Sequence, residues 1–149
     1  MKKIILSLAL VLGCLTFANA QQNALGLKWG TYGTDLSYQR FLNNSNRLEF
    51  NLGMRTFEFN RFTASALYQW VWNINGGFNW YAGGGAGVAF GEHIDFGLNI
   101  LGNIGIEYNF NFPLQLAFDY TPSLLGITPR FGHTYFGNDG IRFAARWRF

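Results

Sequence analysis

The chain has 149 residues, of which 49% are hydrophobic, 19% aromatic and only 13% charged. The charged share is about half of the usual quarter, and so many aromatic residues exclude intrinsic disorder. The length suits a single domain. The formal net charge of +3 includes Lys2 and Lys3 at the start of the chain, so the remainder is nearly neutral and offers no basic surface for nucleic acid.

The first twenty residues have the pattern of a secretory signal peptide. Lys2 and Lys3 precede an apolar stretch from Ile4 to Leu12, and Ala18-Asn19-Ala20 supplies a small-x-small cleavage site. We therefore expect residues 1–20 to be removed and residues 21–149 to form one domain. An alternative interpretation takes Val11-Leu12-Gly13-Cys14 as a lipoprotein cleavage box, with Cys14 acylated.

After this segment, no run of 18 apolar residues predicts a membrane-spanning helix. Apolar and polar residues instead alternate with a period of two, which is typical of β-strands with two different faces. Breaks rich in Asn, Gly and Pro separate eight such segments. The predicted strands are Ala24 to Thr31, Thr34 to Leu42, Arg47 to Arg55, Phe62 to Asn73, Phe78 to Gly91, Phe96 to Asn109, Leu114 to Thr121 and Ile141 to Phe149.

The last predicted strand indicates which solvent each face meets. Ile141, Phe143, Trp147 and Phe149 share one parity, and three arginines occupy the other. The lumen of an eight-stranded barrel is only just wide enough for side chains, so the bulky parity belongs outside and the small, charged parity inside. A closed sheet also pairs every backbone group in hydrocarbon. We therefore predict an all-β fold, an eight-stranded antiparallel up-and-down transmembrane β-barrel. The rival is a soluble lipocalin-type barrel with its aromatic residues around a central cavity.

Aromatic residues of the outward parity gather near the short turns that we expect on the periplasmic side. The predicted periplasmic aromatic girdle, at the depth of the headgroups, consists of Trp70, Trp72, Trp80, Tyr108 and Trp147. The inward parity carries the predicted lumen charge network, which consists of Arg47, Glu49, Arg55, Glu107, Asp119, Arg142, Arg146 and Arg148. These charges are expected to pair across a narrow interior and to close it.

The strand from Trp80 to Phe90, the signal peptide and the terminal Trp147-Arg148-Phe149 resemble the small outer-membrane β-barrels related to the OmpA transmembrane domain and OmpX. The resemblance covers essentially the whole mature chain. It implies a location in the bacterial outer membrane among its lipids, and Phe149 as the assembly signal recognised by the barrel-assembly machinery. It also implies that the Pro122–Gly140 segment is a candidate site for a surface partner. We favour a self-packed cap for this segment over extensions of the seventh and eighth strands.

Some barrels of this size modify lipid A with a His-x-Ser pair and a downstream Glu. Here His133 is followed by Thr134 and Tyr135, and His93 has acidic neighbours without an evident nucleophile. We therefore predict no catalytic residues, no cofactor and no metal. The expected function is a monomeric outer-membrane barrel with a structural, envelope-integrity or surface-interaction role. The alternatives are a narrow channel and a lipid A-modifying enzyme.

Overall fold

The computed structural model describes residues 22–31, 33–55, 61–91, 94–128, 132–133 and 140–149. The predicted signal peptide, residues 1–20, therefore lies outside the described residues. The strands are β1 (Asn23–Gly30), β2 (Gly33–Phe41), β3 (Asn46–Arg55), β4 (Arg61–Asn75), β5 (Phe78–Gly91), β6 (Ile94–Asn109), β7 (Leu114–Tyr120), β8 (Ser123–Thr128), β9 (Gly132–His133) and β10 (Ile141–Arg148). Within these residues, no helix is long and apolar enough to cross a membrane.

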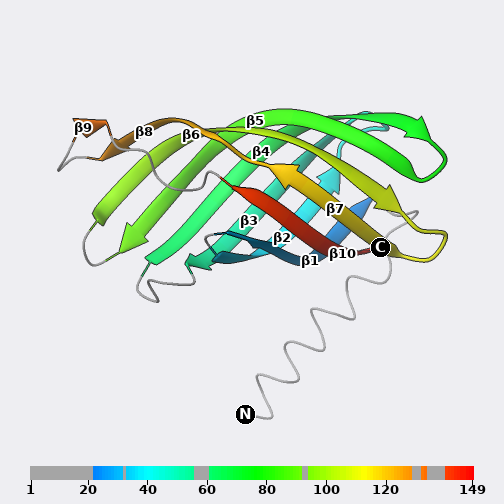
Figure 1. Ribbon diagram of the computed structural model, residues 1–149, viewed down its shortest axis with the longest axis horizontal. Helices are drawn as coiled ribbons and strands as arrows, with labels where there is room; N and C mark the ends of the chain where they lie inside the picture. Colours follow the sequence, from blue (N-terminus) through cyan, green and yellow to red (C-terminus); the bar gives the residue numbers. More distant parts are fainter. Residues whose placement is uncertain (1–21, 32, 56–60, 92–93, 129–131, 134–139) are drawn as a thin grey trace, which may run out of the picture.

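The strands close into a barrel in which every pairing is antiparallel. Each strand from β1 to β6 pairs with the next, β6 pairs with β7, and β10 lies between β7 and β1 (Figure 1). The strand β8 pairs with β6 beyond the end of β7, so β7 and β8 share one place in the ring. The ring thus has eight places, which confirms the predicted eight-stranded antiparallel barrel.

The two-residue period sorts side chains onto the two faces of the wall, as expected for a pleated sheet. Along β10, Trp147 is 56% exposed and the neighbouring Arg146 is 1% exposed. Large apolar residues lie outside on every long strand, whereas the interior is lined by Lys, Arg, Glu, Asp, Asn and Gln side chains. This distribution matches the predicted orientation and excludes the lipocalin-type alternative, in which the large aromatic residues would surround a cavity.

Tight turns connect the strands at one end of the barrel, here named the turn end. In the β2–β3 turn, Asn43 Oδ1 accepts hydrogen bonds from the backbone N–H of Ser45 and of Asn46, at 2.9 and 2.8 Å. In the β4–β5 turn, Gly76 adopts φ +54°, a conformation that glycine enters without steric cost. The opposite end, where β1 ends and β2 begins, is here named the loop end.

The Pro122–Gly140 segment differs from its prediction. The favoured self-packed cap is wrong for Ser123–Thr128, which form β8 and continue the seventh place of the ring along β6. Pro122 cannot donate to the ladder, but its carbonyl accepts a hydrogen bond from Gly102 N–H at 2.9 Å. The pairing then resumes after a register shift between Ile100 and Leu101. Of the rest of the segment, residues 129–131 and 134–139 lie outside the described residues.

Candidate functional site in the barrel lumen

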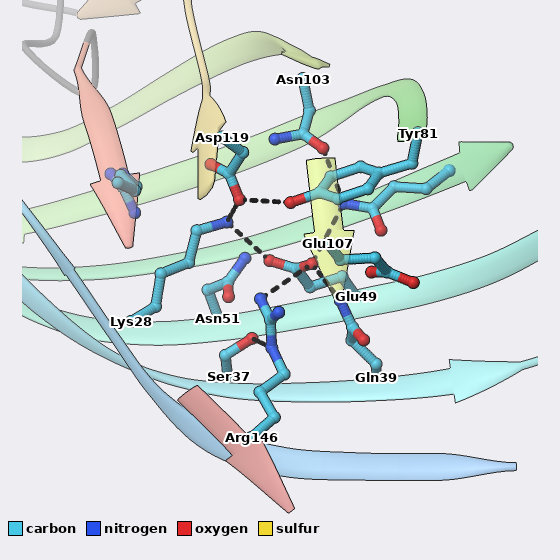
Figure 2. A network of polar contacts seen from close by, with 12 residues as sticks. Lys28, Ser37, Gln39, Glu49, Asn51, Tyr81, Asn103, Glu107, Asp119 and Arg146 are labelled. Atoms are coloured by element: carbon cyan, nitrogen blue, oxygen red, sulfur yellow. Dashed lines mark hydrogen bonds and ion pairs between the residues drawn. The ribbon is translucent and has the colours of Figure 1, made fainter. Parts of the chain in front are cut away.

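A chain of buried ion pairs crosses the lumen between strands that are not neighbours. Lys28 on β1 lies 2.8 Å from Glu49 on β3 and 2.8 Å from Asp119 on β7, measured from Nζ to the carboxylate oxygens (Figure 2). Arg146 on β10 places Nη2 3.3 Å from the second Glu49 oxygen. All four side chains are almost fully buried. Such charges are tolerated only when each is paired and hydrogen-bonded.

Neutral polar side chains complete the surroundings of Glu49 and Arg146. Gln39 Nε2 and Gln69 Nε2 donate to Glu49 Oε2 at 2.8 and 3.0 Å. Ser37 Oγ accepts a hydrogen bond from Arg146 Nε at 2.9 Å. The inward positions of β2, β3, β4 and β10 thus converge on one carboxylate, because alternate residues of each strand face the axis.

A second centre of the same network surrounds Arg47. Its Nη1 lies 2.6 Å from Glu107 Oε2, and its Nε donates to Gln69 Oε1 at 2.5 Å. The guanidinium carbon is 4.5 Å from the centroid of the Tyr81 ring, within cation–π range. Gln69 bonds both Arg47 and Glu49, so the two centres are joined.

Tyr81 on β5 points into the lumen and is fully buried. Its hydroxyl donates to Asp119 Oδ2 at 2.8 Å, and Thr121 Oγ1 donates to the other Asp119 oxygen at 3.1 Å. The ring fits because Gly105 lies beside it: a Cβ at that position would approach Tyr81 to 2.6 Å. The absence of a side chain on β6 therefore admits the aromatic ring from β5.

The structure brings five of the eight predicted lumen charges into this network, namely Arg47, Glu49, Glu107, Asp119 and Arg146. Arg142 is half-buried nearer the loop end and pairs with Asp35. Arg148 lies at the turn end and donates to the Phe110 carbonyl at 2.8 Å and to the Phe112 carbonyl at 3.3 Å. The backbone of Arg55 pairs with Gly33, and its side chain lies outside the described residues.

Three important interior residues were absent from the prediction: Lys28, Asp35 and Tyr81. Residue parity could have found them, because Lys28 alternates with Leu27 and Trp29, and Asp35 with Leu36. The pairing itself departs from strand adjacency. Asp119 and Arg142 are register partners on β7 and β10, yet the ion pairs join Asp119 to Lys28 and Arg142 to Asp35.

The predicted girdle residues lie on the outer face toward the turn end. Trp72 and Trp80 are cross-strand partners with stacked rings 4.3 Å apart, and Trp70 packs edge-on against Tyr68 at 5.0 Å. Tyr108 is half-buried between Phe78 and Phe110, and Trp147 is exposed. At the predicted assembly signal, the backbone N–H and carbonyl of Phe149 both pair with Asn23, at 2.9 and 3.1 Å, and so continue the β1–β10 seam.

A small cavity lies beside the network. A cavity of about 10 Å³, lined in part by Lys28, Asp35, Asn51 and Arg142, lies on its loop-end side and has room for about one water molecule. Among the described residues, no group of three or more His, Cys, Asp or Glu side chains could hold a metal ion. His93 lies outside the described residues, and of His133 the structure gives only the backbone pairing with Ile127.

A closed antiparallel barrel with an apolar outer face and a charged, packed lumen has the fold of a transmembrane β-barrel. The fold is similar to a solved structure described as de novo design of transmembrane β-barrels. The TM-score is 0.64 at 9% identity, and the alignment covers 89% of this chain and 98% of that chain. No protein-family model and no curated protein sequence matches the chain.

Proposed function

We propose that this protein is a monomeric, non-catalytic barrel of the bacterial outer membrane that has a structural or surface-interaction role. The observation that carries the proposal is the buried chain of contacts from Lys28 through Glu49 to Arg146, with Arg47 and Tyr81 beside it. Every charged group in this chain is engaged by another part of the wall. The charges of this chain of contacts therefore stabilise the barrel by pairing with one another across the lumen.

The ion pairs across the lumen favour this proposal over the narrow-channel alternative. An ion crossing the barrel would have to separate Lys28 from two carboxylates or Arg47 from Glu107, and breaking a buried pair costs about 3–5 kcal/mol. The refolded protein should therefore give silent planar bilayers at moderate voltage. Reproducible conductance steps from a preparation shown to be monomeric would favour the channel instead.

The outer-membrane location is supported by the outward apolar face and by the expected signal peptide. In fractionated bacterial cells, the protein should remain in the outer-membrane fraction after a urea wash. Its folded form should migrate differently from the heated form on electrophoresis, because a closed barrel resists unfolding by detergent. Recovery in a detergent-free extract would contradict the proposal.

A surface-interaction role has specific support at β8. This strand extends the wall along β6 beyond the end of β7. Its side chains Leu124, Leu125 and Ile127 are exposed and offer an apolar surface to another protein. A partner that binds there should lose affinity for Leu124→Ser, and Ile141→Val, on β10, is the control.

The proposed absence of catalysis is tested on the lipid. Lipid A from cells with and without the protein should have the same mass spectrum. Loss or gain of one acyl chain only when the protein is present would establish the enzyme alternative.

A further inference from the structure

The wall of the barrel differs greatly in height around the ring. The neighbouring strands β10, β1 and β2 have 8, 8 and 9 residues, and we call them the short wall. The strands β4, β5 and β6 have 15, 14 and 16 residues, and we call them the tall wall. A strand crosses a bilayer with about 9–11 residues, so the short wall is at or below the minimum.

The register shows at which end the heights differ. Followed through β2, β3, β4 and β5, the partners of Lys28 lead to Gly97 on β6, whereas through β10 and β7 they lead to Glu107. The two positions are ten residues apart, which is the stagger of the closed ring. The stagger of ten residues is spread evenly over the eight steps around the ring. Five steps lead to Gly97 and three to Glu107, so the residue of β6 at the same height as Lys28 lies five-eighths of the way from Gly97 to Glu107, at about residue 103.

The difference therefore lies at the loop end. Gly30, the last residue of β1, is level with about residue 101 of β6, and β6 continues upward to Ile94. With about 2.5 Å of height per tilted residue, the tall wall rises roughly 17 Å above the short one. At the turn end, the outward Arg40 on β2 is level with about residue 107 of β6, which is next in sequence to the girdle residue Tyr108. The turn-end limit of the apolar face is therefore at the same height on the two walls.

The outer faces of the two walls meet lipid over different heights. On β2 only Leu36 and Tyr38 are apolar and outward, between Thr34 and the exposed Arg40. On β6 the exposed apolar face extends from Phe96 past Ile106. From Arg40 to the top of β2, the short wall offers roughly 17 Å of height, whereas membrane barrels usually present about 25 Å.

We propose that the bilayer is thinned along the short wall, where lipid headgroups descend to the level of Thr34, while it keeps its normal thickness along the tall wall. This inference rests on the proposed membrane location. A short apolar face is accommodated by local thinning because exposed backbone and charged groups cannot enter hydrocarbon. Tilting the whole barrel would not add apolar height to the short wall, and it would move one side of the even turn end into the hydrocarbon.

The test compares two outward positions at the same height on opposite walls. Thr34 on β2 is level with about residue 101 of β6. It therefore lies at nearly the same height as Ile100, which is an outward residue of β6. In a Cys14→Ser background, Thr34→Cys and Ile100→Cys each carry one environment-sensitive fluorophore. Both proteins are refolded in dioleoyl- and in dilauroyl-phosphatidylcholine vesicles. Lipids brominated near the headgroup or near the chain end measure the depth of each label.

In dioleoyl vesicles, we expect the Thr34→Cys label to lie about 8 Å nearer the headgroups than the Ile100→Cys label, which is the shortfall of the short wall. The difference should shrink in the thinner dilauroyl vesicles. Equal depths in dioleoyl vesicles would overturn the inference and leave the membrane location intact. Shielding of the Thr34→Cys label from both bromolipids and water would overturn it in favour of a second copy on the short wall. Failure of both labels to contact lipid would overturn the membrane location itself.

Discussion

Glu49 has more polar contacts than a single ion pair supplies. Lys28, Gln39, Gln69 and Arg146 reach it from four different strands, and all of these side chains are buried. Every one of these contacts requires a full negative charge or a lone pair on the carboxylate. The residue therefore acts as a clamp that holds strands β1, β2, β4 and β10 to β3 through the lumen.

Replacing Glu49 by glutamine keeps the shape and places an amide N–H₂ against donor groups. We expect Glu49→Gln to lower the free energy of unfolding by about 3–5 kcal/mol, because it breaks a buried pair. Guanidinium titration of the vesicle-refolded barrel measures the loss. Asp35→Asn is the control: its pair with Arg142 is more exposed, so its loss should be smaller. Equal effects of the two substitutions would show that Glu49 is no clamp.

The hydroxyl of Tyr81 gives a second test at this scale. Tyr81→Phe keeps the ring over Arg47 and removes the bond to Asp119, so the expected loss is about 1.5–3 kcal/mol. The same titration applies. Phe118→Tyr adds a hydroxyl to an exposed outward ring and should change little. A Tyr81→Phe protein as stable as the wild type would mean that Asp119 is satisfied without it.

The sequence predicts which face of the barrel wall a charged residue occupies better than it predicts the residue's ion-pair partner. Parity alone assigns Arg47, Glu49 and Arg146 to the interior, because a strand has only two faces. Which charges meet depends on the ten-residue stagger of the closed ring, and no local pattern contains that number. For this reason Arg142 is beside Asp119 in the ladder but pairs with Asp35.

At the scale of the elements, the β4–β5 turn depends on one glycine. Gly76 has φ +54°, and a Cβ there would meet no atom within 4 Å, so a side chain costs conformational energy alone. We expect Gly76→Ala to destabilise the barrel by about 1–2 kcal/mol and Gly76→Asn to cost much less, because asparagine tolerates this region. Thermal unfolding on gels separates them. A reversed order of the two variants would contradict this explanation.

The seam between β1 and β10 includes the end of the chain. Phe149 pairs with Asn23 through its backbone, so Phe149→Ala retains those bonds and removes only the ring. If the ring is the assembly signal that the resemblance implies, Phe149→Ala should reduce the amount assembled in cells and leave refolding in vesicles unchanged. Phe149→Tyr should assemble normally. Equal loss in both assays would assign the ring a role in stability instead.

The strand β8 is an element that the sequence pattern does not predict. Pro122 and Gly126 interrupt the alternation that marks the other strands, so the segment has the composition of a loop. Its pairing partner, the loop-end half of β6, lies more than twenty residues earlier in the sequence and is available because β7 ends at Tyr120. The sequence therefore predicts the eight places of the ring but misses the continuation of the seventh.

At the scale of the whole molecule, the two faces of the barrel wall have opposite chemistry. The lumen holds paired charges and amides, and the outer face holds exposed aliphatic and aromatic side chains. In water, this outer face would be an apolar patch far larger than soluble monomers carry. The same surface is stable in hydrocarbon, where the closed ring satisfies the backbone without water.

The protein's five tryptophans test directly whether the outer face meets lipid, because all of them lie on that face and are 39–56% exposed. They are Trp29, Trp70, Trp72, Trp80 and Trp147. The decisive measurement is their intrinsic fluorescence in vesicles that contain brominated lipid, compared with quenching by aqueous iodide. An outer face in contact with lipid predicts strong quenching by the bromolipid and weak quenching by iodide. Strong quenching by iodide with no effect of the bromolipid would contradict a membrane barrel.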